Sequence, residues 1–140
     1  MTPVLLDTGV VVALLDASEK LHSLCARAVE ALYAPLITCE AVIAESCYLL
    51  RNLPGAPETV LDNVTAGVFQ IPLQLSRESL AVREVARRYR DRRIDLADAC
   101  LIVLAERFNT ADVLTLDRDF AIYRWGKRRP FRLLPERDRM

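Results

Sequence analysis

The stretch Val4-Leu5-Leu6-Asp7-Thr8-Gly9 decides the fold that this sequence predicts. Three consecutive apolar residues that end at an acid and a glycine-containing turn are typical of a short strand buried in a parallel sheet. Similar apolar runs predict four further short strands, at residues 36–38, 69–73, 113–115 and 131–133. Because helices are predicted between most of these strands, the order of elements indicates an α/β fold in three layers, in which helices flank a short parallel sheet.

The helices are predicted from apolar periodicity and from capping residues. Helical segments are expected at residues 10–15, 18–32, 40–51, 57–65, 76–90 and 95–108. Ser18 is the candidate N-cap of the second of these helices. No repeat, linker or low-complexity tract divides the 140 residues, which is an ordinary length for one domain. We therefore expect a single domain over residues 1–140.

The composition excludes several classes of protein. Hydrophobic residues make up 52% of the chain and charged residues 27%, which is the balance of a folded globular protein. The longest apolar run has seven residues, at 99–105, whereas a membrane-spanning helix needs about 20. One histidine and four cysteines without close pairs do not supply the ligands of a structural zinc site. Since the first residues also lack a signal-peptide pattern, we expect a cytoplasmic protein that does not enter a membrane.

The net charge is zero, but the charges are unevenly distributed. Residues 1–76 carry three basic and eight acidic side chains, whereas residues 77–140 carry 16 basic and 11 acidic ones. Most of the basic residues are arginines, which form two clusters at 83–93 and 124–132. Arginine binds phosphate groups bidentately, so these clusters favour a polyanionic partner. For the first cluster, a solvated helix face with local Glu–Arg pairs explains the pattern equally well.

Four acids lie at positions that point to chemistry. Asp7 and Asp117 follow predicted strands, and the carboxyl ends of parallel strands are where such sheets form their sites. Glu45 and Asp98 lie on apolar faces of predicted helices, where a lone carboxylate is costly unless it is paired or binds a cation. Two alternatives stay open. Asp7 also suits a turn, and arginines from other helices also suit Glu45 and Asp98 as partners.

Two further acids have simpler interpretations. Asp95 lies three residues before Asp98 and suits the N-cap of the same helix. Asp119 suits the cap of a short helix that begins near Phe120. Spacing alone does not decide whether Asp117 or Asp119 is the fourth acid of the site.

A cluster of carboxylates needs a compensating charge, because like charges disfavour one another's ionised forms. Oxygen ligands without histidine or cysteine select Mg²⁺ or Mn²⁺. A site of this kind leaves coordination positions for water and for a substrate phosphate. The chemistry that it serves best is the metal-assisted attack of water on a phosphodiester bond.

Four segments of the sequence together resemble a PIN domain, and among PIN domains the VapC-type toxin ribonucleases of type II toxin–antitoxin pairs. In chain order they are Leu5-Leu6-Asp7-Thr8, Ala44-Glu45, Ile94-Asp95-Leu96-Ala97-Asp98-Ala99 and Thr115-Leu116-Asp117-Arg118-Asp119-Phe120. The resemblance covers essentially the whole chain. It implies the α/β/α PIN fold and the activity of an endoribonuclease that uses Mg²⁺ or Mn²⁺.

The resemblance also implies roles for individual residues. Metal binding and catalysis fall to an acidic quartet, which here is Asp7, Glu45, Asp98 and Asp117. Supporting positions near the metal or the phosphate are Asp95, Asp119, Thr8 and Thr115.

The implied partners are an RNA substrate, a cognate antitoxin that covers the site, and a second copy of the chain in a homodimer. The alternative is a PIN-like RNA-binding or antitoxin-binding module with little catalytic activity, and the complete acidic set favours the enzyme. Other metal-dependent phosphate enzymes fit less well. The chain has no Asp-x-Asp after its first strand and no glycine-rich phosphate-binding motif.

Overall fold

The computed structural model describes residues 1–137. The elements, in chain order, are β1 (Val4–Leu6), α1 (Thr8–Leu15), α2 (His22–Glu30), β2 (Leu36–Ile37), α3 (Glu40–Leu49), α4 (Ala56–Thr65), β3 (Phe69–Gln70), α5 (Leu75–Arg88), the 3-10 helix η1 (Arg90–Arg92), α6 (Leu96–Phe108), β4 (Asp112–Leu114), the 3-10 helix η2 (Arg118–Ala121), β5 (Arg124–Trp125), β6 (Arg129–Pro130) and β7 (Arg132–Leu134).

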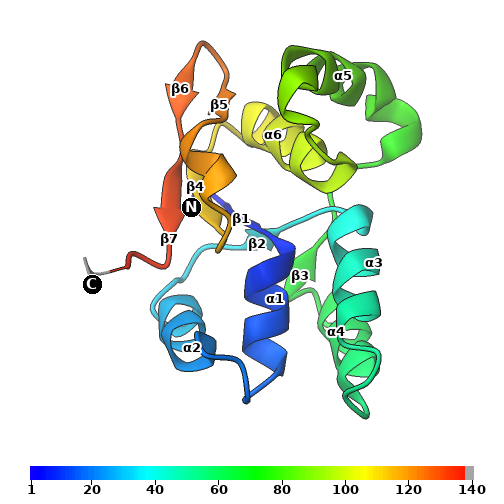
Figure 1. Ribbon diagram of the computed structural model, residues 1–140, viewed down its shortest axis with the longest axis vertical. Helices are drawn as coiled ribbons and strands as arrows, with labels where there is room; N and C mark the ends of the chain where they lie inside the picture. Colours follow the sequence, from blue (N-terminus) through cyan, green and yellow to red (C-terminus); the bar gives the residue numbers. More distant parts are fainter. Residues whose placement is uncertain (138–140) are drawn as a thin grey trace.

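Five short strands form one parallel sheet in the order β3-β2-β1-β4-β7. The central strand β1 is fully buried and pairs through Leu5 with Ile37 on one side and Val113 on the other. In the view of Figure 1, α5 and α6 lie at the upper right of the strands of the sheet, α1, α2 and α4 lie below them, and α3 lies to their right. The predicted three-layer arrangement is therefore confirmed. Because β1 and β4 are parallel neighbours, the residues that follow them meet at one edge of the sheet.

Helix α6 is the central helix of the core. Every residue from 97 to 105 is buried, as expected for a helix whose surface is apolar almost all round. Asp95 caps its N-terminus, since its side chain accepts a hydrogen bond from the backbone N–H of Asp98 at 2.8 Å. Asn109 ends the helix in the left-handed conformation, at φ 51°. Burial from Ala97 onward packs Asp98, in the first turn of α6, against the core.

A small hairpin, β5–β6, stands outside the main sheet and was not predicted. Its two strands are antiparallel, and each has only two residues. Trp125 anchors it, because the indole ring is buried and its Nε1–H donates to the carbonyl of Pro130 at 3.1 Å. The guanidinium of Arg129 lies 5.1 Å from the centre of the same ring. Strands of this length carry no periodic signal, so sequence patterns miss them.

The second helix begins later than predicted. Ser18 does not cap it, because both the backbone N–H and the hydroxyl of Ser18 bind Asp16 Oδ1, at 3.0 and 2.6 Å. Because Ser18 is engaged in this local turn, it does not cap the helix, and α2 begins at His22 instead. The remaining helices agree with the predicted ranges within about two residues at most ends. In the part of the chain that the structure describes, no helix has the length and apolar character needed to cross a membrane.

Candidate metal centre

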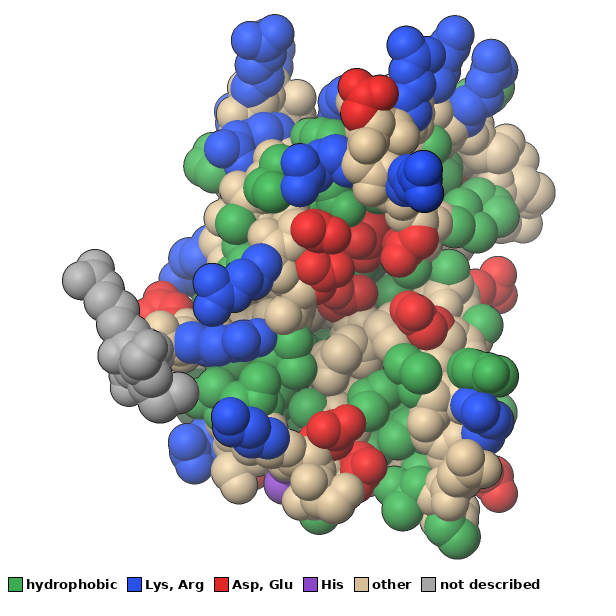
Figure 2. Space-filling view, in the orientation of Figure 1, with side chains coloured by type: hydrophobic (Ala, Val, Ile, Leu, Met, Phe, Trp, Pro, Cys, Tyr) green, Lys and Arg blue, Asp and Glu red, His purple; other side chains and the backbone are tan. Residues whose placement is uncertain are grey.

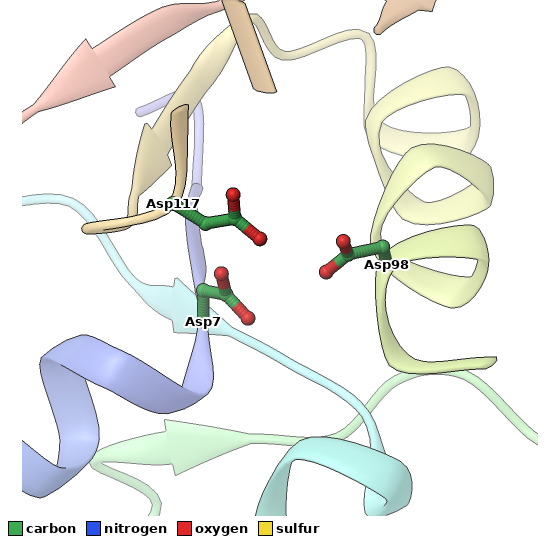
Figure 3. Close-up of side chains that lie close together, drawn as sticks. All are labelled: Asp7, Asp98 and Asp117. Atoms are coloured by element: carbon green, nitrogen blue, oxygen red, sulfur yellow. The ribbon is translucent and has the colours of Figure 1, made fainter. Parts of the chain in front are cut away.

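Three of the predicted acids converge at the carboxyl edge of the sheet. Asp7 directly follows β1, Asp117 follows β4, and Asp98 lies in the first turn of α6. One carboxylate oxygen from each lies within 4.8 Å of those of the other two. Figure 3 shows the three side chains extending into a common space, two from the strand side and one from α6. Asp7 and Asp98 are buried and Asp117 is exposed, so the cluster faces solvent on one side.

Asp7 and Asp117 are held in place by Thr115. The Thr115 hydroxyl donates to Asp7 Oδ2 at 2.7 Å and accepts from the backbone N–H of Asp117 at 3.0 Å. The other oxygen of Asp7 accepts from the backbone N–H of Thr8 at 2.8 Å, which caps α1. Thr115 is itself buried. Thr115, expected to lie near the metal or the phosphate, therefore connects the residues that follow β1 and β4 by direct hydrogen bonds.

Asp98 is held by two contacts of different kinds. Its backbone N–H donates to Asp95, which is exposed and caps the helix as predicted. Its Oδ2 accepts a hydrogen bond of 3.3 Å from the hydroxyl of Tyr123. Tyr123 is buried, and sequence reasoning missed it because nothing in its own segment marks it as a neighbour of residue 98.

Glu45 differs from the expectation. It does not lie on a buried face of α3, since its side chain is exposed and its neighbours Tyr48 and Leu49 are 62% and 53% exposed. Apolar neighbours indicated a buried face, but these two side chains themselves face solvent. Glu45 Oε1 nevertheless accepts a hydrogen bond of 2.7 Å from Thr8 Oγ1, and Glu45 lines the same cavity as the three aspartates. It thus lies at the rim of the site, outside the three-carboxylate cluster.

The choice between Asp117 and Asp119 follows from the backbone. Asp117, and not Asp119, caps the 3-10 helix η2, because Asp117 Oδ1 accepts from the backbone N–H of Asp119 at 2.9 Å. The prediction that Asp119 caps this short helix is therefore wrong, because the cap lies two residues earlier, at Asp117. Only Asp117 of the pair joins Asp7 and Asp98.

The buried aspartates resist ionisation without a cation. Burial raises the pKa of Asp7 to about 6, against the lowering effect of the hydrogen bonds from Thr115 and Thr8. Burial also raises the pKa of Asp98 to about 8, with further contributions from the charges of Asp7, Asp95 and Asp117. A divalent cation among these oxygens would reverse this effect, because it stabilises the ionised carboxylates.

The three aspartates line a cavity of about 490 Å³. Lys20 is the only basic residue that lines this cavity within residues 1–137. Figure 2 shows the acidic side chains gathered in a hollow at the centre of this face, with basic side chains above and to the left of it. The donor set consists of carboxylate oxygens alone, which suits a hard divalent ion such as Mg²⁺ or Mn²⁺. The cavity leaves room beside the acids for a phosphate group and water.

A parallel α/β/α domain with carboxylates at the ends of β1 and β4 and at the start of α6 is suited to metal-dependent phosphodiester chemistry. The profile of the PIN domain family matches residues 4–126. The chain belongs to the PIN domain family.

Two relatives refine this assignment. Ribonuclease VapC26 of Mycobacterium tuberculosis is 31% identical over 116 residues, which cover 81% of this chain and 86% of the relative. The crystal structure of Mycobacterium tuberculosis VapC20, described as a sarcin–ricin loop cleaving toxin, matches with a TM-score of 0.76 and 19% identity. That match covers 91% of this chain and 99% of VapC20 and shows the shared fold. The resemblance to VapC-type PIN domains and the nuclease class are therefore confirmed.

Proposed function

We propose that the protein is a metal-dependent endoribonuclease and the toxin of a toxin–antitoxin pair. The observation that carries this proposal is the convergence of the carboxylates of Asp7, Asp98 and Asp117 in one open cavity. The naming of VapC26 as a ribonuclease and of VapC20 as a toxin that cleaves the sarcin–ricin loop supports RNA as the substrate.

The three aspartates would hold Mg²⁺ or Mn²⁺, and Glu45 would complete the site from its rim. When bound, the ion lowers the pKa of a water nucleophile and offsets negative charge that develops on the phosphate. Thr115 keeps Asp7 and Asp117 at a fixed separation, and Thr8 orients Glu45. Asp95 and Asp119 would not contact the ion but would position its ligands. Asp95 caps α6 next to Asp98, and the backbone N–H of Asp119 donates to Asp117.

The substrate that suits this site is single-stranded or looped RNA, since bases in A-form helices are poorly accessible. Hydrolysis would leave a 5′-phosphate and a 3′-hydroxyl. We further propose that the chain forms a homodimer in the cytoplasm and that a cognate antitoxin covers the acidic cavity until it is released.

Cleavage of a labelled RNA by the purified protein tests the proposal. Wild-type protein should cut internally with Mg²⁺ or Mn²⁺ and not in EDTA. Asp98→Asn should reduce the rate at least about a hundredfold, because a ligand is lost while the size of the side chain is kept. Asp95→Asn is the matched control three residues away, and it should stay active because asparagine also caps helices well.

Other results would contradict the proposal. Cleavage by wild-type protein in EDTA, or full activity of Asp98→Asn, would rule out this metal centre. Tight RNA binding with no cleavage in any divalent ion would favour the binding-module alternative.

A further inference from the structure

The two arginine-rich segments, far apart in the sequence, lie side by side in the fold. The backbone N–H of Arg124 donates to the hydroxyl of Tyr89 at 2.8 Å, which joins the β5–β6 hairpin to the end of α5. Glu106 on α6 makes a second link, since its Oε2 accepts from the backbone N–H of Gly126 at 3.1 Å and lies 3.7 Å from Arg88. In Figure 2 the basic side chains gather along the upper part of the molecule, above the acidic hollow.

A groove of about 840 Å³ lies between these two segments. Its lining residues are Arg88, Tyr89, Ile122, Arg124, Gly126, Lys127 and Arg128. Four of these seven carry positive charge, and no acidic residue within residues 1–137 lines the groove. Tyr89 and Ile122 supply an apolar part of the wall. A groove with this lining suits a flexible polyanion that also has flat, apolar groups.

The hairpin presents its charges from a fixed backbone. Lys127 and Arg128 occupy the turn after Gly126, and both side chains are exposed. Within residues 1–137, neither makes an ion pair with an acid. Arg128 has a φ of 60°, a left-handed conformation that favours glycine and gives arginine no structural advantage. An arginine in this conformation is consistent with a side chain that serves in binding a ligand and not in stabilising the fold.

Two tyrosine side chains in contact link the wall of the groove to the acidic cluster. Tyr89, in the groove wall, packs edge-on against Tyr123 with ring centres 5.0 Å apart. The hydroxyl of Tyr123 in turn donates to Asp98. The basic groove and the acidic cavity thus lie on opposite sides of one buried tyrosine. The groove and the cluster are therefore separated by two aromatic side chains along this path.

We propose that the groove between α5 and the β5–β6 hairpin binds the phosphate backbone of the RNA next to the bond that is cut. This inference rests on the proposed ribonuclease function. An acidic cluster repels a polyanion, so affinity for RNA has to come from positive charge nearby. Arginine forks match phosphate oxygens, and a tyrosine face stacks on bases without regard to sequence. These features favour RNA over an acidic polypeptide as the ligand.

A pair of double variants tests the groove. Lys127→Gln/Arg128→Gln removes two charges from its rim, and Arg27→Gln/Arg51→Gln removes two exposed charges from α2 and the end of α3. Binding of a fluorescent single-stranded RNA is measured in EDTA, without turnover, over a range of salt concentrations. The groove variant should bind at least about fivefold more weakly. Its slope of log affinity against log salt should be shallower by about 1.4, which is 0.7 per lost contact.

The control variant should bind RNA as wild type does. An equal loss of RNA affinity in the two variants would overturn the proposal, since RNA binding would then depend on the total charge of the protein and not on the groove. Unchanged RNA binding by the groove variant would overturn it too, and a loss of binding to a polyglutamate peptide alone would assign the groove to an acidic partner.

The measurement is independent of catalysis, so its failure is distinguishable from failure of the proposed function. If wild-type protein cuts RNA and the groove variant binds normally, only the groove proposal fails.

Discussion

Tyr123 donates a hydrogen bond of 3.3 Å to Asp98, from a residue that follows η2 to one in the first turn of α6. Burial, followed by the charge of Asp98, raises the pKa of Tyr123 above its usual range, so the phenol stays protonated and remains a donor. The ring is held independently of this bond, since it packs edge-on against Tyr89 and Phe120 at 5.0 and 5.2 Å.

Tyr123→Phe separates the hydroxyl from the ring. The variant should fold normally and bind Mn²⁺ about tenfold more weakly, because residues that orient a metal ligand typically contribute this much to metal affinity. Titration calorimetry measures the affinity. Mn²⁺ affinity equal to that of wild type would show that the bond does not position Asp98.

Metal binding should stabilise the fold through Asp117 and not through Asp119. An ion that binds only the native state at 100 times its dissociation constant adds about 2.7 kcal/mol to the free energy of unfolding. Mn²⁺ should therefore raise the Tm of wild type and of Asp119→Asn by several degrees. Asp117→Asn should show much less of this increase. A loss confined to Asp119→Asn would move the fourth acid to that position.

The stability of the metal-free protein should fall as the pH rises. Asp98 has a pKa of about 8 in the folded chain and 3.8 as an unperturbed side chain, so the native state binds more protons between these pH values. The free energy of unfolding is therefore highest near pH 4 and declines toward pH 8, by about 1.4 kcal/mol per unit of pKa difference at most. Asp7, with a pKa of about 6, adds to the decline between pH 4 and 6.

Urea unfolding in EDTA measures this dependence. Asp98→Asn removes the larger contribution, so the variant should be more stable than wild type at pH 8 and similar to it at pH 4. Parallel pH profiles for the two proteins would show that Asp98 ionises normally in the folded state.

Variants of Thr8 and Glu45 test whether Glu45 contributes to RNA cleavage through its charge or through its orientation by Thr8. Glu45→Gln keeps an oxygen that accepts the 2.7 Å bond from Thr8 but removes the charge, whereas Thr8→Val keeps the charge and removes the bond. If Glu45 acts through its charge, Glu45→Gln should slow RNA cleavage about tenfold or more and Thr8→Val less. The reverse order would mean that the position of Glu45 matters more than its ionisation.

The parts of the fold that the sequence predicted are those with strong local signals. The buried strand β1 and the largely apolar helix α6 combine hydrophobicity with a clear boundary, at Asp7 and at the cap Asp95. The two-residue strands of the hairpin have no such signal, because they are too short to show a period and are held by contacts such as those of Tyr89 and Glu106, which lie far away in the sequence. The start of α2 was misplaced because Asp16 competes for the groups of Ser18.

The site was predictable in its strand-end acids and less so elsewhere. Asp7 and Asp117 follow from the rule that parallel strands end at one edge, and Asp98 from an acid in an apolar helix. The contact of Tyr123 with Asp98 depends on tertiary packing, which no spacing in the sequence encodes. Glu45 was expected to be buried because apolar neighbours suggested a core face, and its real partner is a threonine 37 residues away.

The order of the three aspartates along the chain has a consequence for synthesis. Asp7 belongs to the first strand, but Asp98 and Asp117 come late, and β4, which precedes Asp117, lies between β1 and the last strand β7. A growing polypeptide therefore lacks at least one of the three carboxylates until most of it has been translated. If cleavage requires all three aspartates, as proposed, a ribosome that makes this protein holds an inactive chain until Asp117 has been added and folded, and its own messenger is not exposed to a working nuclease before then.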